Sequence, residues 1–314
     1  MDISIVVPVY NEEENIENLV LEITKVVSEQ KYNAEIIFVN DGSSDNTLQK
    51  LKTLSANNSY LKIIDLRKNF GQTSAMVAGF DHSKGNIIIA MDGDGQNDPK
   101  DIPNLINKLN EGFDIVSGWR KNRKDKMLSR RLPSVIANKI ISCSTGIKLH
   151  DYGCSLKAFK REVIENINLY GEMHRFIPAV ASWMGVKINE IEVNHRPRTA
   201  GKSKYGINRT LRVILDLITV KFLLSFSTKP IQIFGFWGFL CLFGGFLFTA
   251  IVIIQRFFFL IPANRPLFTI AVMLILSGFQ FICFGLLSEI QIRMYHESTS
   301  KPIYAIKEII QKNS

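Results

Sequence analysis

The stretch Ile87–Gln96 reads IIIAMDGDGQ, an apolar run that ends in two aspartates separated by one glycine. This pattern predicts a buried strand that delivers two carboxylates to the edge of a sheet. Gly93 and Gly95 allow a tight backbone turn and the close approach of a ligand. Two neighbouring carboxylates repel each other unless a cation lies between them, and Mg²⁺ or Mn²⁺ suits such oxygen ligands together with substrate phosphates. The alternative is a solvated acidic turn after a strand.

Three similar apolar runs precede this stretch and predict strands at residues 3–10, 34–40 and 61–66, with the fourth strand at 86–91. Helices are expected between them, the first capped by Asn11 and the others at 47–54 and 73–80. Alternating strands and helices predict a mainly parallel sheet covered on both faces. Ligands bind such sheets beyond the carboxyl ends of the strands. Polar residues at these ends should therefore converge on one crevice: Tyr10, Asn11, Glu12, Asp41, Asp92 and Asp94.

The middle of the chain continues the α/β pattern and becomes basic. We expect a helix at 101–110, a strand at 113–120 that ends in Arg120, a helix from 170 to 184 and a strand at 187–193. The run 121–131 is rich in Lys and Arg and precedes an amphipathic segment at 132–141. A charge run of this kind is usually a solvated loop, but guanidinium groups also bind phosphate with two hydrogen bonds.

The last third of the chain is strongly apolar. Residues 231–254 and 267–287 contain no charged side chain, and each run is long enough to cross a bilayer core of about 30 Å. Residues 207–225 mix cations with apolar side chains, which predicts an interfacial helix. The expected organisation is a catalytic domain at 1–206, this interfacial helix at 207–229, a transmembrane hairpin at 230–290 and a tail at 291–314 that forms a short helix from Lys301.

Composition and charge narrow the function classes. The net charge is +9, but no aromatic-basic RNA motif accompanies it, so a membrane surface is a better partner than nucleic acid. The four cysteines have no paired spacing and are expected to be reduced. No signal peptide precedes the first strand, and the charges flanking the apolar runs suit both termini on the inner side. We therefore expect a multi-pass membrane protein whose N-terminal domain lies in the cytoplasm.

Three motifs at the strand ends carry a family resemblance: VVPVYNE at 6–12, VNDGSSD at 39–45 and MDGDGQ at 91–96. In this order they resemble the nucleotide-sugar motifs of glycosyltransferase family 2. The nearest group is the polyisoprenyl-phosphate glycosyltransferases, similar to dolichol-phosphate mannose synthase and to the bacterial undecaprenyl-phosphate glucosyltransferases. The resemblance covers essentially the whole chain, including the two membrane helices, and it implies the GT-A type of α/β nucleotide-binding domain.

The resemblance implies roles for residues on the donor side. Pro8, Tyr10 and Glu12 would line the base and ribose pocket, and Asp41 would hydrogen-bond the base. Asp92 and Asp94, with Gln96 beside them, would hold Mg²⁺ or Mn²⁺ against the diphosphate of the nucleotide. The Asp-Gly-Asp sequence departs from the Asp-Ala-Asp common in the group but keeps both carboxylates. The structural alternatives are a strand-end proline, a packed tyrosine and a turn-capping aspartate.

The resemblance also places an acceptor side. Arg120, with Arg130 or Arg131, would bind the lipid phosphate, and Asp151 in the motif HDYGCSLKAF would be the catalytic carboxylate beside Asp94. A phosphate acceptor is already anionic at neutral pH, so Asp151 could orient a substrate instead of removing a proton. Arg198, Ser203 and Lys204 lie in a basic segment that would close on the diphosphate. A strand-entry cap at Asp151 and an ordinary basic surface loop are the structural alternatives, and His174 is expected to be structural.

The resemblance thus implies an inverting glycosyltransferase of the bacterial inner membrane, which moves a sugar to undecaprenyl phosphate or a related polyisoprenyl phosphate, with UDP-glucose as the first choice of donor. The same transfer with GDP-mannose, UDP-GlcNAc or a UDP-aminoarabinose derivative is the first alternative. A catalytically silent, nucleotide-binding membrane scaffold is the second alternative. Small residues in the membrane helices (Gly235, Gly238, Gly244 and Gly245) also permit a homo-oligomer.

Overall fold

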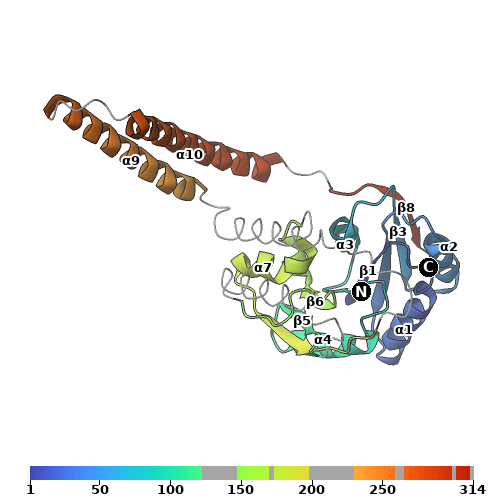
Figure 1. The fold of residues 1–314 in the computed structure, drawn as a ribbon. Helices are drawn as coiled ribbons and strands as arrows, with labels where there is room; N and C mark the ends of the chain where they lie inside the picture. Colours follow the sequence, from blue (N-terminus) through green and yellow to red (C-terminus); the bar gives the residue numbers. More distant parts are fainter. Residues whose placement is uncertain (122–146, 170–172, 198–229, 259–264, 299–301, 312–314) are drawn as a thin grey trace. The chain divides into compact units, whose positions relative to one another are not determined.

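The structure is a computed structural model of the chain, and it describes residues 1–121, 147–169, 173–197, 230–258, 265–298 and 302–311. The chain divides into two compact units (Figure 1). The first unit contains Met1–Leu224 and Pro302–Ser314, and the second contains Ser225–Lys301. The first unit is an α/β domain, and the second is a pair of long apolar helices.

One eight-stranded sheet, with strand order β7-β5-β6-β4-β1-β2-β3-β8, forms the centre of the first unit. Its strands are β1 (Ile3–Val9), β2 (Ala34–Asn40), β3 (Leu61–Leu66), β4 (Ile87–Ala90), β5 (Ile115–Trp119), β6 (Lys157–Lys160), β7 (Ile188–Glu192) and β8 (Ile306–Gln311). The pairs β1–β2, β1–β4, β2–β3 and β5–β7 are parallel. Strand β6 runs antiparallel to β4 and β5, and β8 runs antiparallel to β3. The prediction of a mainly parallel sheet is confirmed, with two antiparallel strands, β6 inside the sheet and β8 at its edge.

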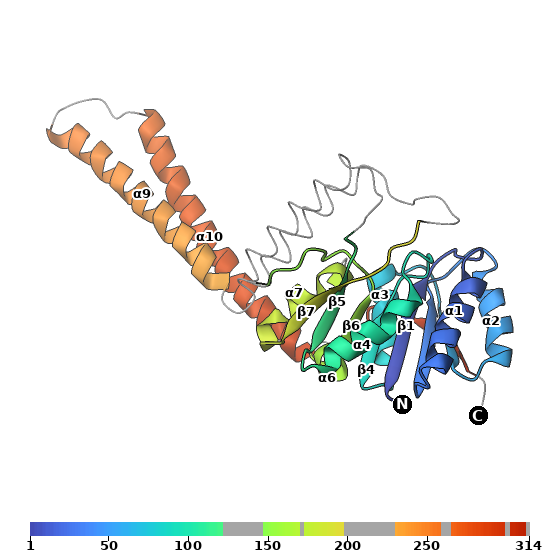
Figure 2. The ribbon, with the colours of Figure 1, turned by 90° about the horizontal axis from the view of Figure 1, so that it is seen from below.

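Helices cover both faces of this sheet, as predicted (Figure 1, Figure 2). Side chains alternate across a strand, so Ile5 and Val7 of β1 join one apolar cluster and Val6 joins the other. The first cluster includes α1 (Ile16–Glu29), α2 (Thr47–Asn57) and α4 (Ile102–Asn110). The second includes α3 (Gln72–Asp81), α6 (Arg161–Glu165), η3 (Met173–Phe176) and α7 (Ile177–Ala181). Burial of each large apolar side chain contributes about 1.5–3 kcal/mol to this packing.

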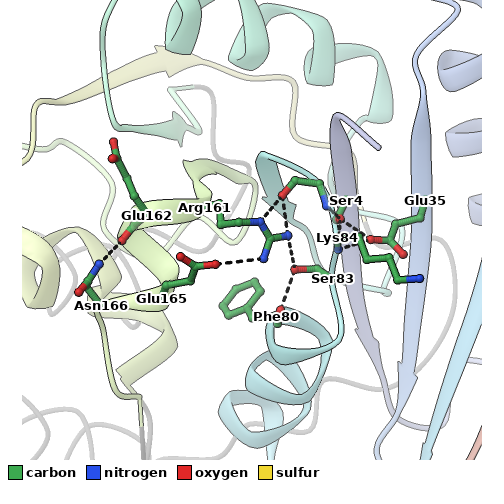
Figure 3. Close-up of polar contacts among 10 residues, drawn as sticks. Ser4, Glu35, Phe80, Ser83, Lys84, Arg161, Glu162, Glu165 and Asn166 are labelled. Atoms are coloured by element: carbon green, nitrogen blue, oxygen red, sulfur yellow. Dashed lines mark hydrogen bonds and ion pairs between the residues drawn. The ribbon is translucent and has the colours of Figure 1, made fainter.

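Polar side chains join the amino ends of the central strands (Figure 3). The buried Glu35 carboxylate, at the start of β2, accepts the Ser4 hydroxyl of β1 at 2.6 Å. The backbone N–H of Gly85 donates to Ser4 Oγ, and the Arg161 guanidinium donates to the Gly85 carbonyl. A Cβ on Gly85 would lie 2.5 Å from backbone atoms of Ile3 and Ser4, so only glycine fits there. This end of the sheet is therefore rigidly fastened, which leaves the carboxyl ends for ligands.

The second unit is a hairpin of two helices, α9 (Pro230–Phe258) and α10 (Arg265–Ser298). Within them, Phe234–Phe257 and Pro266–Ser288 are long and apolar enough to cross a membrane. At 1.5 Å per residue these spans measure about 36 Å and about 34 Å. Most of their residues face outwards, and the exposed side chains include many aromatics: Phe236, Phe239, Phe243, Phe246, Phe268, Phe279 and Phe284. A soluble protein would bury such helices, so their exposure supports a lipid environment.

A seam of small residues joins the two helices. A Cβ on Gly238 would lie 2.8 Å from Ile282, and one on Gly245 would lie 2.6 Å from Ile275. Gly278 approaches Leu242 in the same way. Gly235, in contrast, has no neighbour within 4 Å at its Cβ position. Gly238 and Gly245, predicted to permit close packing, therefore serve the contact within the hairpin.

The prediction of a short helix in the tail is wrong. Within the tail, Ile306–Gln311 form β8, which extends the sheet along the edge of β3. Lys307 and Glu308 of β8 form ion pairs with Asp65 and Lys52. The Tyr304 hydroxyl donates to Asp81 at 2.8 Å. The tail forms a strand because it pairs with the edge of β3. The residue pattern of the tail alone does not reveal this partner.

Two further local predictions are corrected. Asn11 does not cap the first helix: it has a φ of 53°, and α1 begins at Ile16. The predicted continuous helix from 170 to 184 is, over its described residues, a succession of short pieces: η3, α7 and η4 (Ser182–Met184). Pro178 lies in the first turn of α7, where its missing N–H is tolerated, and Gly185 ends η4 in the left-handed region.

Candidate active site

The carboxyl ends of β4, β1 and β2 lie side by side, because these strands are neighbours in the sheet. This order brings together the three motifs singled out in the sequence. Pro8 is buried within β1 and pairs with Val39 of β2, whereas Tyr10 follows the strand with 36% of its surface exposed. The convergence expected of the strand ends is therefore present.

Side chains of the loops after β1 and β2 hold these loops together. The Asn11 side-chain oxygen accepts the backbone N–H of Ser44 at 2.8 Å, and the Ser43 hydroxyl accepts the N–H of Asn11 at 3.0 Å. Thr47 Oγ1 accepts the backbone N–H of Glu12 at 2.9 Å. The Glu12 carboxylate accepts the Asn15 amide. Glu12 is thus fixed just before α1, and the loop that carries it is held against the loop after β2.

Asp41 fastens a third loop to the same place. Its carboxylate accepts the backbone N–H groups of Phe70 and Gly71 at 2.7 and 3.0 Å. Burial raises the pKa of Asp41, and the two backbone hydrogen bonds oppose that rise. A Cβ on Gly42, whose φ is +65°, would collide with the backbone of Lys68 and Asn69 at 2.4–2.6 Å. Asp41 and Gly42 therefore set the position of the loop that begins α3.

Asp92 and Asp94 follow β4, as the sequence indicates. Gln72, the first residue of α3, donates its side-chain N–H to Asp92 Oδ1 at 2.6 Å. The backbone N–H of Gln96 donates to Asp94 Oδ1 at 3.1 Å, and Gly95 turns the chain with a φ of 71°. Burial raises the pKa of Asp92, and the negative charge of Asp94 raises it further. A cation between the two carboxylates would relieve both effects.

Arg120 and Asp151, predicted to have separate roles, bind each other. Arg120 Nε donates to Asp151 Oδ2 at 2.7 Å, and a terminal guanidinium nitrogen donates to Oδ1 at 2.9 Å. The backbone N–H of Gly153 also donates to Oδ1. Burial opposes the charge of Arg120, but the hydrogen bond and attraction to Asp151 raise its pKa overall. The pair carries both charges into a nearly buried position, with side-chain exposures of 12% and 5%.

Lys157, which the sequence reading did not single out, lies behind this pair. It is 2% exposed and donates to the carbonyl oxygens of Tyr152 and Cys154. Burial lowers the pKa of Lys157, while the nearby charges of Asp151 and Asp92 act to raise it. The lysine therefore fixes the turn that carries Asp151 and adds a positive charge close to Asp92.

The segment after β7 is attached directly to the Asp92 motif. The backbone N–H of Arg196 donates to the Gln96 carbonyl at 2.9 Å. The Arg196 guanidinium pairs with Asp98 and with Glu22 of α1, each at 2.7 Å. Asn194 donates to the carboxylate of Asp98 as well. The chain therefore enters the predicted diphosphate-binding segment from a point beside Gln96.

Several predicted residues lie outside the described part of the chain. These are Arg198, Ser203 and Lys204, assigned to the diphosphate, and Arg130 and Arg131, assigned to the acceptor phosphate. Of the other predicted residues, Pro8, Tyr10, Glu12, Asp41, Asp92, Asp94 and Gln96 gather at the neighbouring ends of β1, β2 and β4. The Arg120–Asp151 pair interacts with this group through charge, because the positive charge of Arg120 lowers the pKa of Asp92.

Sequence reasoning missed the side chains that support Asp92. Gln72, Asn97 and Ser155 received no role from the sequence, because no rule of spacing assigns a role to a neutral amide or hydroxyl. His174 was expected to be structural, and its Nδ1 lies 2.7 Å from the hydroxyl of Thr73, the residue after Gln72. It therefore braces the first turn of α3.

The residues present suit a divalent cation held jointly with a substrate. Among the described residues, no group of three or more His, Cys, Asp and Glu could hold a metal ion by itself. Asp92 and Asp94 supply two carboxylates, and Mg²⁺ or Mn²⁺ is usually bound by one or two carboxylates plus substrate phosphates. Burial and the charge of Asp94 both raise the pKa of Asp92, and a bound cation would favour its ionised form.

Comparisons with known proteins agree on one family. Residues 4–167 match the sequence family described as glycosyl transferase family 2. A dodecaprenyl-phosphate galacturonate synthase of Rhizobium johnstonii is 42% identical over 322 aligned residues, which cover 100% of this chain and 94% of that protein.

Solved structures agree on the fold. Glucosyl-3-phosphoglycerate synthase from Mycobacterium tuberculosis, in complex with Mn²⁺, UDP-glucose and phosphoglyceric acid, superposes with a TM-score of 0.54 at 17% identity, covering 70% of this chain and 79% of that chain. Mannosyl-3-phosphoglycerate synthase from Rubrobacter xylanophilus gives a TM-score of 0.56 at 12% identity, with coverage of 71% and 74%. At these identities the likeness concerns the fold, which is of the GT-A type, as predicted.

Proposed function

This chain belongs to glycosyl transferase family 2, and from that premise we propose that it transfers a sugar from a nucleotide donor to a polyisoprenyl phosphate. The observation that carries the proposal is the carboxylate pair Asp92 and Asp94 at the strand ends, in a chain that also has two helices able to cross a membrane. The similarity to a dodecaprenyl-phosphate galacturonate synthase along the whole chain supports the lipid acceptor.

On the donor side, Pro8, Tyr10, Glu12 and Asp41 bind the nucleoside, with Asp92 beside them. Asp92, Asp94 and Gln96 would hold a divalent cation, which would supply positive charge to neutralise the departing diphosphate. Arg198, Ser203 and Lys204 close on the same diphosphate. The attachment of Arg196 to Gln96 and Asp98 supports this last assignment, because it starts that segment beside the metal-binding motif.

On the acceptor side, the lipid phosphate attacks the anomeric carbon from the face opposite the diphosphate, so the sugar configuration is inverted. A phosphate monoester carries about 1.5 to 2 negative charges at neutral pH, so it needs little help from a general base. Asp151 accepts four N–H groups in this structure, two of them from the Arg120 side chain. We assign Asp151 to holding Arg120 in place, and Arg120 with Arg130 or Arg131 to attracting the acceptor phosphate.

Two donors compete for the proposal. UDP-glucose is the first choice from the family resemblance, whereas the Rhizobium johnstonii relative is named for galacturonate. A galacturonate donor brings an additional carboxylate, which Arg120 or Lys157 would attract. The proposed location is the bacterial inner membrane, with the catalytic domain at the cytoplasmic face, where nucleotide sugars are made.

The test is transfer by the full chain purified in detergent. UDP-glucose and nucleotide-activated galacturonic acid are each supplied with undecaprenyl phosphate and Mn²⁺, and the lipid product is identified by mass spectrometry. Asp94→Ala should lower the rate at least 100-fold, and Asp2→Ala, at the opposite end of β1, should leave it unchanged. Full transfer by Asp94→Ala after removal of divalent metal would contradict the proposed mechanism. Failure to release nucleotide with any donor in the presence of the lipid would favour a silent scaffold.

A further inference from the structure

Two uncharged side chains act as hydrogen-bond donors to the Asp92 carboxylate. One precedes Asp92 in the sequence and the other follows it. Gln72, at the start of α3, donates to Oδ1 at 2.6 Å. Ser155, in the turn before β6, lies near the same carboxyl group, and its hydroxyl lowers the pKa of Asp92 as a hydrogen-bond donor does. Neither Gln72 nor Ser155 carries a charge, so the Asp92 carboxylate keeps the negative charge that attracts a cation. A carboxylate has about four acceptor sites, so two remain for a further ligand.

Asn97 determines which way the Ser155 hydroxyl points. Its side-chain nitrogen donates to Ser155 Oγ at 2.8 Å, and Asn97 itself is 4% exposed. A hydroxyl group has one hydrogen to donate. Because Ser155 Oγ accepts from Asn97, its own hydrogen is left for Asp92. The chain of hydrogen bonds therefore has a direction, from Asn97 through Ser155 to Asp92.

Asn97 is also fixed by the segment after β7. It forms an isolated antiparallel bridge with His195, and the neighbouring Gln96 carbonyl accepts the backbone N–H of Arg196. The residue that directs Ser155 is thus held where three segments meet. These are the turn after β4, the turn before β6 and the segment after β7.

We propose that Ser155 and Asn97 are positioning residues for Asp92, which together with Gln72 hold its carboxylate in the orientation that binds the divalent cation of the donor complex. This inference rests on the proposed function. Side chains that orient a metal ligand typically contribute 10- to 100-fold to metal affinity. Neither Ser155 nor Asn97 touches the reacting atoms, so their effect should appear in metal binding and not in the chemical step.

The experiment measures Mn²⁺ binding by electron paramagnetic resonance, with the full chain in detergent and UDP present. Ser155→Ala and Asn97→Ala should weaken Mn²⁺ binding about tenfold. Ser155→Thr, which keeps the hydroxyl, should stay within about twofold of the wild type. Ser83→Ala is the matched control, because Ser83 is also a buried hydroxyl with one short bond, 2.7 Å to the Phe80 carbonyl, at the opposite end of β4 (Figure 3).

Turnover at rising Mn²⁺ concentration separates positioning from damage to the fold. A positioning role predicts that saturating Mn²⁺ restores kcat in Ser155→Ala, whereas a damaged fold lowers kcat at every Mn²⁺ concentration. Wild-type Mn²⁺ affinity in Ser155→Ala, or a loss in Ser155→Thr equal to that in Ser155→Ala, overturns the inference while the wild-type protein still binds Mn²⁺ and transfers sugar. If the wild type binds no Mn²⁺ with UDP, the metal-dependent function fails and the inference fails with it.

Discussion

Asp151 and Arg120 act as one unit at the scale of single residues. The sequence separated them, giving the carboxylate a catalytic role and the guanidinium an acceptor-binding role. In the structure the Arg120 guanidinium donates two hydrogen bonds to the Asp151 carboxylate, at 2.7 and 2.9 Å, and both side chains are almost completely buried. A buried ion pair gains little over an apolar pair, but loss of one partner leaves an uncompensated charge. The pair should therefore respond very differently to single and double substitutions.

Arg120→Ala should lower the free energy of unfolding by about 3–5 kcal/mol, because it leaves the Asp151 carboxylate buried without its cation. The double variant Arg120→Ala/Asp151→Ala should lose less than the sum of the two single variants. Urea unfolding of the detergent-solubilised chain, followed by tryptophan fluorescence, measures all four proteins. Strictly additive losses would show that the two residues do not act together.

At the scale of elements, sequence patterns found the strands that carry the site because each is a continuous apolar run. The alternation of strands and helices predicted that these strands are parallel, whereas the order β4, β1 and β2 is seen only in the structure. The role of Asn11 was predicted wrongly because its side chain accepts a hydrogen bond from Ser44, which lies 33 residues away, and does not cap the helix. β8 was not predicted because it forms by pairing with β3, some 240 residues earlier. Patterns read within a short window contain neither partner.

The supports of Asp92 escaped for a different reason. Gln72, Asn97 and Ser155 come from three separate segments, and each is a common polar residue in a loop or at a helix start. Only the three-dimensional contacts distinguish them from solvated side chains. A sequence can therefore indicate which carboxylates bind a metal but not which neutral groups hold them.

The attachment of β8 should depend on pH through Tyr304. Its hydroxyl donates to Asp81, and burial, followed by that hydrogen bond, raises its pKa above the ordinary tyrosine value near 10. A raised pKa means that this contribution to stability is complete below pH 10. It is lost as the pH rises from about 10 towards the higher pKa of the folded state.

Tyr304→Phe should therefore cost about 0.5–1.5 kcal/mol at pH 8, the usual net value of one hydrogen bond. The gap between wild type and variant should shrink as the pH rises from 8 to 10.5. Unfolding at the two pH values measures this gap, and Tyr60→Phe, at an exposed position, is the control. A gap that stays constant over this range would contradict the role of the Tyr304 hydroxyl.

The whole molecule is constrained by the return of the chain to its first unit. The described residues within 1–197 lie before α9 and belong to the α/β unit, and β8, which lies after α10, joins the same sheet. Pairing of β8 with β3 requires both to be on the same side of a membrane. If α9 crosses the bilayer, α10 must therefore cross back, which agrees with the two apolar spans and with the close seam of Gly238, Gly245 and Gly278.

Labelling with a membrane-impermeant thiol reagent should reveal this arrangement. In a background without other reactive cysteines, Lys25→Cys reports on the α/β unit, Ser314→Cys on the chain after β8, and Ala263→Cys on the connection between α9 and α10. In inverted membrane vesicles the first two should react and the third should not, and intact spheroplasts should give the opposite pattern.

Reaction of all three from one side would show that the hairpin does not cross the bilayer. Opposite sidedness of Lys25→Cys and Ser314→Cys would show that β8 leaves the sheet in the membrane-bound protein. The predicted pattern keeps the Asp92 site on the same side as both chain ends, which in the proposed orientation is where nucleotide sugars are available.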